Sequence, residues 1–225
     1  MARFPMEPLL RLAPSAALLE KRLRAALGER REQDEPRLAA AVEEAQILGS
    51  LDLAGREAAP EEVAALRAAR RAVPPAAPLT ADTLLAWSGA LSGRAAAWRR
   101  VERAREDGPP PAPAAFVESR VRVLEHWLAE PSGRELAAAP QAALVMVRIH
   151  EILPFEEANG LVARLAASHL MVRAGARPPV LVAADRARLD AALTAAYQLD
   201  TEPLCRLLED AATRALEVMV RAIER

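Results

Sequence analysis

The residues that carry the most chemistry lie in one stretch, residues 149–165, which reads IHEILPFEEANGLVARL. A helix-forming apolar run leads into Pro-Phe, two carboxylates and Ala-Asn-Gly, and a second helix-forming run follows. A helix that starts near Asn159 and Gly160 has free N–H groups at its first turn and the positive end of its dipole there. Because both features attract anions, this spacing predicts a phosphate site at the helix start.

Two charged residues extend this prediction. Glu157 immediately precedes the expected helix, where a carboxylate can hold Mg²⁺ against bound phosphates. Arg164 lies one turn inside the helix, and its planar guanidinium suits a terminal phosphate. The spacing alone leaves a second interpretation open, a helix–turn–helix in which Asn-Gly does no more than cap.

The elements around this stretch are expected to be helical. Ala, Leu, Arg and Glu favour helices, whereas aromatic residues make up only 3% of the chain, so the composition predicts an all-α fold. Pro and Gly mark the ends of the segments. Helices are expected over residues 16–27, 35–53, 61–72, a short stretch after 80, 116–128, 135–152, 160–174, 185–198 and 202–223. Residues 73–78 are expected to form a linker and residues 108–113 a loop.

Composition also excludes several classes of protein. A net charge of −1 argues against nucleic-acid binding that is independent of sequence, which needs a clustered positive surface. A single cysteine, Cys205, excludes an intrachain disulfide framework and a multi-cysteine metal site. Apolar runs are shorter than a membrane span requires, and residues 1–10 do not read as a secretory signal, so no membrane association is expected. The expected location is the cytoplasm.

Residues 153–164, LPFEEANGLVAR, resemble the motif of the Fic/Doc (Fido) family, HPFxDGNGRxxR. Laid without gaps, six motif positions match: Pro154, Phe155, Glu157, Asn159, Gly160 and Arg164. Three positions differ, since Leu153 replaces the His, Ala158 the first Gly and Leu161 the first Arg. The flanking segments are also similar, so the resemblance extends over residues 36–220.

The resemblance implies an all-α, Fic-type helical bundle with a short flap near residues 106–114, for which a small β-hairpin is an alternative. It divides the chain into an N-terminal helical extension, residues 1–72, and a Fic-like domain, residues 80–225, within one compact unit. The segment EEAQILGSLDLAG weakly resembles the inhibitory helix of many members and brings Asp52 to the inhibitory position. Arg99 and Arg100 resemble residues before the family's flap and are expected to face the solvent.

Family members typically transfer AMP, or another phosphate-containing group, from a nucleotide to a hydroxyl group of a target protein. The resemblance therefore implies ATP with Mg²⁺ as ligand, with Glu157 holding the metal. It implies that the phosphates are held by residues of the next helix and its start: Ala158, Asn159, Gly160 and Arg164.

The three substitutions act against transfer. Leu153 occupies the position of the catalytic base, and loss of a general base typically costs ~10²–10⁴ in rate. Leu161 lacks the bidentate phosphate contact of an arginine. Ala158 adds a Cβ where the family has glycine, with a strain of about 1 kcal/mol if this position requires a positive φ.

Three hypotheses follow. In the first, the chain is a catalytically impaired Fic protein that acts by binding a nucleotide or a protein partner. In the second, it is an active nucleotidyl- or phosphotransferase that uses either His150 or substrate-assisted chemistry. His150 lies nearly one turn before Leu153, and its alternative interpretation is a partly buried helix histidine. In the third, it is an interaction module with an empty cleft, for which a homodimer is one assembly, since Ala-rich helices pack closely.

Overall fold

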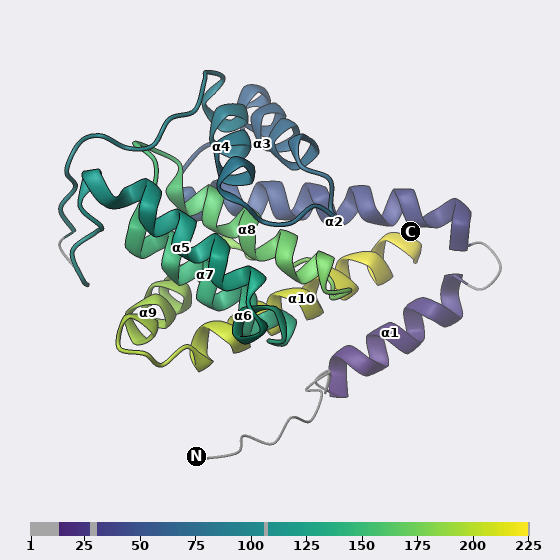
Figure 1. Ribbon diagram of the computed structural model, residues 1–225. Coiled ribbons are helices and arrows are strands. Elements are labelled where there is room, and N and C mark those ends of the chain that lie inside the picture. Colours follow the sequence, from purple (N-terminus) through teal and green to yellow (C-terminus); the bar gives the residue numbers. More distant parts are fainter. Residues whose placement is uncertain (1–13, 28–30, 106–107, 225) are drawn as a thin grey trace, which may run out of the picture.

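The computed structural model describes residues 14–27, 31–105 and 108–224 (Figure 1). All regular secondary structure in these ranges is helical, which confirms the all-α prediction. The helices are α1 (Pro14–Leu27), α2 (Arg31–Ala54), α3 (Pro60–Ala72), α4 (Ala81–Ser92), α5 (Val117–Ala129), α6 (Pro131–Arg134), α7 (Ala138–Ile152), α8 (Asn159–Arg173), α9 (Arg186–Tyr197) and α10 (Glu202–Ile223). Two 3₁₀ turns, η2 (Ala114–Phe116) and η3 (Ala183–Asp185), precede α5 and α9.

Most predicted helices are confirmed within a few residues, and two boundaries are wrong. Helix α2 begins at Arg31 and contains Pro36, whereas the sequence placed its start at residue 35. Helix α7 begins at Ala138 rather than at residue 135, because the preceding Ala137 has an extended backbone with ψ 156°. The four residues Pro131–Arg134 form a separate turn, α6, that was not predicted.

Helices α7 and α8 form the centre of the molecule (Figure 1). Every residue from 161 to 171 of α8 is buried, because α2, α4 and α7 all pack against this helix. A helix enclosed in this way does not need a single apolar stripe. The phosphate site predicted at the first turn of α8 therefore belongs to a rigid element.

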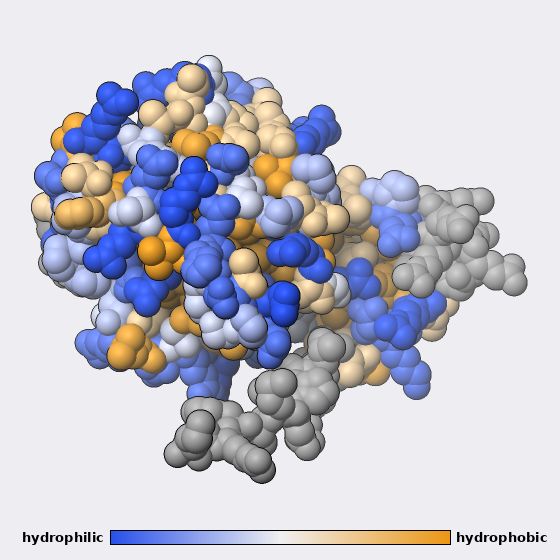
Figure 2. Space-filling model, in the orientation of Figure 1, coloured by the Kyte–Doolittle hydropathy of each residue, from blue (hydrophilic) through white to orange (hydrophobic). Residues whose placement is uncertain are grey.

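A second, smaller core joins α10 to α1 and α2. Helix α10 packs against α1 and α2 as well as α7 and α9 (Figure 1). The buried side chains of this core are Ala16, Leu23, Leu38, Val42, Val180, Ala215, Leu216, Met219 and Val220. On the face seen in Figure 2, hydrophilic and hydrophobic side chains are interspersed. Among the described helices, none has the length and apolarity to cross a membrane.

The predicted flap lies partly outside the described residues, since residues 106–107 are among those that the structure does not describe. Residues 108–113 form no helix and no strand, so the β-hairpin alternative is not seen in the described part of the flap. The first ten residues, where a secretory signal was judged absent, also lie outside the described residues. The division into residues 1–72 and 80–225 stays a prediction.

Candidate functional site

The loop between α7 and α8 is held at both ends by residues in the left-handed conformation. Leu153 has φ 48° and ψ 65°, and Ala158 has φ 61° and ψ 15°. This conformation raises the free energy of a residue with a Cβ by about 1–2 kcal/mol, whereas glycine adopts it with almost no strain. The family's glycine at the position of Ala158 is therefore explained by the backbone, and strain is concentrated at the motif.

The side chain of Asn159 fixes the shape of this loop. Its Oδ1 accepts a hydrogen bond from the N–H of Phe155 at 2.9 Å, and its Nδ2 donates to the carbonyl of the same residue at 2.8 Å. Phe155 is buried and stacks on Trp98, with ring centroids 5.4 Å apart. Asn159 thus contributes by positioning the loop that leads into α8.

The first turn of α8 keeps its backbone donors free. The first intrahelical bond runs from Val162 N–H to Ala158 O, and Ala158 has no side chain that could cap the helix. In the hydrogen bonding of the described residues, the N–H groups of Asn159, Gly160 and Leu161 have no acceptor. Free N–H groups at the positive end of a helix dipole attract anions, so this geometry is compatible with the predicted phosphate site, which stays a prediction.

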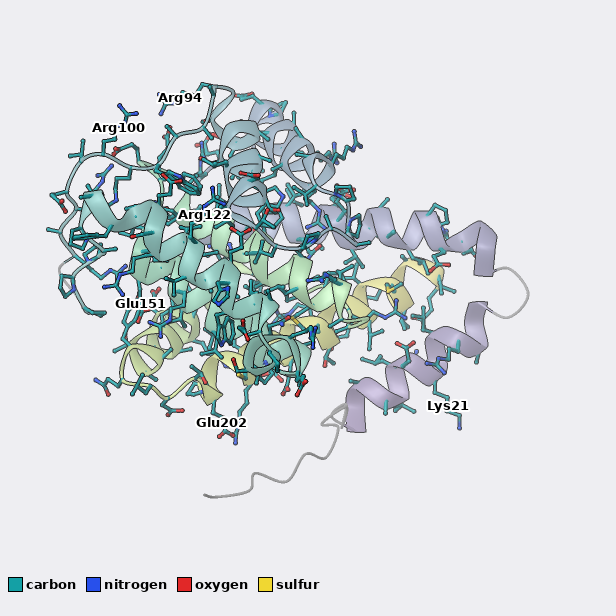
Figure 3. The ribbon with its side chains drawn as sticks, viewed as in Figure 1. Lys21, Arg94, Arg100, Arg122, Glu151 and Glu202 are labelled. Carbon is teal, nitrogen blue, oxygen red and sulfur yellow. The ribbon has the colours of Figure 1, made fainter. Side chains whose placement is uncertain are left out.

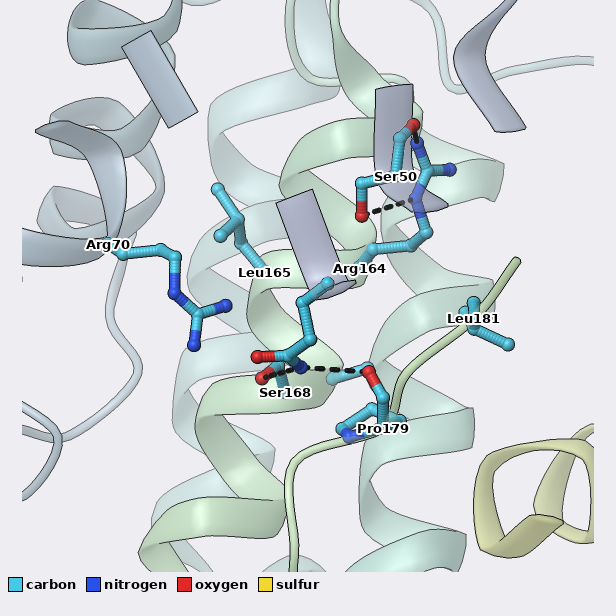
Figure 4. A pocket seen from close by; sticks show the side chains of 9 residues that line it. Ser50, Arg70, Arg164, Leu165, Ser168, Pro179 and Leu181 are labelled. Carbon is cyan, nitrogen blue, oxygen red and sulfur yellow. Dashed lines mark hydrogen bonds between the residues drawn. The ribbon is translucent and has the colours of Figure 1, made fainter. Parts of the chain in front are cut away.

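The side chain of Arg164 turns back toward this site but is held by α2 (Figure 4). Its guanidinium donates to Ser50 through Nη2–O at 2.8 Å and Nε–Oγ at 3.4 Å. Nη1 lies 3.3 Å from the point that a Cβ on Gly160 would occupy. Burial, with a further effect from Arg186, lowers the pKa of Arg164 to about 10, and no ion pair within the described ranges includes it.

A small cavity separates this arginine from α3. It is lined by Gln46, Ser50, Arg70 and Ser168 as well as Arg164, and its volume of about 20 Å³ accommodates about one water molecule (Figure 4). A larger hollow of about 510 Å³ lies at the other end of α8, around Leu170 and Arg173. Neither is lined by Asn159 or Gly160, so a cleft in front of the free N–H groups stays a prediction.

His150 lies on the α7 side of the same turn. Its Cε1 is 4.0 Å from the point that a Cβ on Gly160 would occupy, and its Nε2 is buried with no hydrogen-bond partner. Burial, followed by the charges of Arg164 and Arg105, lowers the pKa of His150 to about 4. The imidazole is therefore neutral at pH 7, and although the residue is only half-buried, its Nε2 atom is enclosed.

Glu157 is exposed and forms an ion pair with Arg94, with Nη2 and Oε1 2.9 Å apart. Figure 3 shows Arg94 and Arg100 projecting outward from the segment that follows α4. An exposed pair of this kind contributes little to stability, so Glu157 is free to exchange its partner for a cation. Across the described ranges no three potential ligands gather around a metal position, but one carboxylate together with substrate phosphates suffices for Mg²⁺.

Arg99 is buried, so the predicted solvent-facing pair is wrong for this residue, whereas Arg100 is exposed. The Arg99 guanidinium donates to four backbone carbonyls: Val101 (2.6 Å), Ala112 (2.6 Å), Leu153 (2.8 Å) and Ile152 (3.2 Å). Its own N–H donates to Pro154 O at 2.8 Å. One arginine therefore ties the segment after α4 to the end of α7 and to the motif loop.

Two further arginines of this segment contact the motif. Arg103 donates to the carbonyl of Glu156 at 2.7 Å and to its carboxylate at 3.2 Å. Desolvation raises the pKa of Glu156, but hydrogen bonds from Arg100 and Arg103 outweigh it and lower the pKa overall. Arg105 donates to His150 O and lies over the ring of Tyr197, 5.0 Å from its centroid.

The segment that resembles the inhibitory helix forms the last turns of α2, and the inhibitory role of Asp52 stays a prediction. Asp52 is exposed, and its carbonyl, rather than its carboxylate, accepts a hydrogen bond from Arg186 at 2.7 Å. Ser50, two residues earlier on α2, is the residue that contacts Arg164. Leu161, at the position of the family's first arginine, is 2% exposed in the main core, whereas Leu153 is half-buried and outside it.

Sequence comparisons agree with this geometry. The profile of the Fic/DOC family matches residues 78–171, which include α4 to α7 and nearly all of α8. A protein adenylyltransferase Fic from Drosophila mojavensis is 29% identical over 113 residues, and that from Drosophila melanogaster is 28% identical over 113 residues. The match covers 50% of this chain but only 22% and 23% of those two proteins.

Solved structures show the same fold over nearly the whole chain. A Fic domain containing signaling protein from Bacteroides thetaiotaomicron superposes with a TM-score of 0.75 at 16% identity, covering 93% of this chain and 98% of the other. Residues 134–508 of Fic-1 from C. elegans superpose with a TM-score of 0.70 at 20% identity, covering 92% of this chain and 72% of the other. The fold and the motif thus define an all-α protein of Fic type. Within it, residues 78–171 are the part whose sequence matches the Fic/DOC family.

Proposed function

We propose that this chain is a Fic-type protein that binds a nucleotide, ATP with Mg²⁺, and transfers its AMP group poorly or not at all. The observation that carries the proposal is the first turn of α8, where three N–H groups stay free beside Arg164 while Leu153 stands at the position of the base. A hydrocarbon side chain cannot take a proton from a target hydroxyl. The biological role then lies in binding nucleotide or a protein partner, with the cytoplasm as the proposed location and a homodimer as one proposed assembly.

Each group has a specific task in this proposal. The N–H groups of Asn159, Gly160 and Leu161 bind phosphate oxygens, and the Asn159 side chain keeps the loop in place for them. Arg164 supplies positive charge from the side, and Glu157 holds Mg²⁺. When bound, Mg²⁺ neutralises part of the phosphate charge.

The alternative is an active transferase in which His150 replaces the missing base. A general base must come within hydrogen-bonding distance of the proton that it removes. Because Nε2 of His150 is enclosed and has no partner, a hydroxyl group on another protein does not reach it in this conformation. The buried position of Nε2 in His150 therefore favours the binding role over the enzyme.

Calorimetry with ATP, with and without Mg²⁺, tests the proposal at pH 7.5. We expect Mg²⁺ to tighten ATP binding by the wild-type protein, and Glu157→Ala to lose most of this gain. Glu156→Ala is the matched control, because its carboxylate is held by Arg103 and Arg100, and it should keep the gain. Absence of ATP binding by the wild type would favour the interaction module. Incorporation of label from the α-phosphate into protein would favour the enzyme.

A further inference from the structure

The larger hollow, at the C-terminal end of α8, is remote from the motif loop. Its volume of about 510 Å³ lies in the range of small-molecule sites, roughly 300–1,000 Å³. Its walls come from α5, α6, α7, the end of α8 and the segment that leads into α4 (Figure 1). Arg173 at this end lies about 21 Å along the helix axis from Asn159, at 1.5 Å per residue. A ligand in the hollow is therefore separate from one at the motif.

Contacts between the surrounding elements hold the walls of the hollow in place. Nε2 of Gln141 on α7 donates to Gly133 O in α6 at 2.8 Å. Gly133 also lies so close to the end of α5 that a Cβ there would collide with the carbonyl of Trp127. On the opposite side, a ring nitrogen of His169 in α8 is hydrogen-bonded to Ala77 O at 2.8 Å. The hollow is thus formed by the folded chain before any ligand arrives, as is usual for small-molecule sites.

The charged groups of the hollow leave two cations uncommitted. Arg134 of α6 and Arg173 of α8 are both exposed, and neither has an ion pair or a side-chain hydrogen bond with any residue that the structure describes. The carboxylate of Glu125 is already engaged, since it accepts from the N–H of Ala81 at 3.2 Å and pairs with Arg122 at 3.3 Å. Two guanidinium groups and one carboxylate give the lining a net charge of +1.

Neighbouring acceptors do not occupy these two arginines. An arginine in the last turn of a helix can bond the final carbonyls. In α8, however, the carbonyls of residues 170–172 accept backbone N–H groups of residues 174–176, so the guanidinium of Arg173 is not needed there. The carboxylate of Glu130, four positions before Arg134, contacts His126 at 3.3 Å instead. Both guanidinium groups are therefore available to an anion from solution.

We propose that this hollow binds a small organic carboxylate with an apolar body. The head group contacts Arg134 and Arg173, whose planar forks match the geometry of a carboxylate. The body packs on Leu79 and Leu170, which are buried, and on Leu128, which is half-buried. A net charge of +1 complements a monoanion rather than a dianion such as a phosphate monoester. This inference is independent of the proposed function, because the hollow contains no residue of the motif.

NMR titration with 4-phenylbutyrate at pH 7.5 tests the inference. We expect the side-chain Nε–H resonances of Arg134 and Arg173 to shift with a common dissociation constant. The neutral 4-phenylbutyramide should bind about tenfold more weakly, because it loses the charge-assisted hydrogen bonds. Acetate should also bind about tenfold more weakly, because it has the head group without the apolar body. ATP with Mg²⁺ should not displace 4-phenylbutyrate.

Variants locate the site. Arg134→Gln and Arg173→Gln remove one guanidinium each from an exposed position, and each should weaken 4-phenylbutyrate binding about tenfold. Arg120→Gln is the matched control, because Arg120 is exposed on α5, does not line the hollow and should leave the affinity unchanged.

Four results would overturn the inference. Absence of 4-phenylbutyrate binding, or wild-type affinity in both variants, would show that the arginines hold no such ligand. Equal binding of the amide would show that charge plays no part. Tighter binding of 3-phenylpropyl phosphate would exclude a carboxylate as the preferred head group. Displacement by ATP with Mg²⁺ would show that the two sites are not separate.

Discussion

Ala158 shows most directly how a single residue sets the cost of the motif loop. Its φ of 61° is a conformation that favours glycine, so Ala158→Gly removes strain of about 1–2 kcal/mol and adds about 0.5–1 kcal/mol of unfolded-state entropy. We predict that the variant is more stable by about 0.5–1 kcal/mol in urea unfolding. Ala191→Gly, at an exposed helical position of α9, is the control and should lose about 1 kcal/mol. A destabilised Ala158→Gly protein would show that the left-handed conformation is wrong.

Leu153 and Leu161 differ in what their replacement by the family's residues should cost. Leu161 is 2% exposed in the main core, so Leu161→Arg buries an unpaired cation and loses about 1.5–3 kcal/mol of apolar burial. Leu153 is only half-buried and has a positive φ, which histidine tolerates. We predict that thermal unfolding shows Leu161→Arg strongly destabilised and Leu153→His within about 1 kcal/mol of the wild type. Equal losses in the two variants would contradict the different burial of these positions.

The buried imidazole of His150 should also make the ligand-free protein sensitive to acid. Its pKa is about 4 in the folded state against 6.5 in the unfolded chain, so the unfolded state binds more protons between these values. The contribution of His150 is fully present above pH 6.5 and is lost as the pH falls, up to about 3 kcal/mol near pH 4. We predict that the free energy of unfolding of His150→Gln, measured in urea, falls less steeply between pH 6.5 and pH 4 than that of the wild type. His126→Gln, at an exposed position, should follow the wild type.

At the scale of elements, the end of α7 and the segment after α4 are joined through Arg99. Its planar guanidinium reaches four carbonyls that a lysine ammonium cannot satisfy together. Because each unsatisfied buried carbonyl costs about 1–3 kcal/mol, we predict that Arg99→Lys loses about 2–4 kcal/mol in urea unfolding. Amide hydrogen exchange should also quicken at Arg99 and Ala112, whose N–H groups bond to Pro154 O and Glu151 O. Arg100→Lys, at an exposed position, is the control. An Arg99→Lys protein as stable as the wild type would contradict the role of Arg99 in joining the two elements.

Most helices could be predicted from sequence because local signals determine them. Helix α4 starts after the cap Thr80 and ends at Gly93, whose φ is 66°, and α3 starts at Pro60. The start of α2 was missed because Pro36 suggests a boundary, yet the backbone remains helical around it. Helix α6 was missed because four residues are too few for a periodic pattern to appear.

The candidate site is predictable only as far as one continuous segment supplies it. The order of residues 153–164 predicts an anion site, and their resemblance to the family motif predicts that the base is missing. Ser50 and Arg99 left no such signal, because they are 114 and 54 positions away from the groups that they bond. The burial of Leu161 likewise depends on helices packed around α8, which the motif itself does not encode.

At the scale of the whole molecule, three distant parts of the chain assemble the site. The α7–α8 hairpin supplies the donors, α2 orients Arg164 through Ser50, and the segment after α4 fixes the loop through Arg99. All three rest on the main core around α7 and α8 (Figure 1). The central claim is therefore that this scaffold keeps a working nucleotide site while Leu153 removes the base that transfer requires.

Filter binding with ATP labelled at its α-phosphate, in the presence of Mg²⁺, tests this claim most directly when each sample is read before and after acid denaturation. We predict label retained on the wild-type protein before denaturation and lost after it, because the nucleotide is bound but not attached covalently. The same loss should occur when candidate target proteins are added. Label that survives acid would contradict the claim by demonstrating transfer, and label absent before acid would contradict it by showing that the site does not bind the nucleotide.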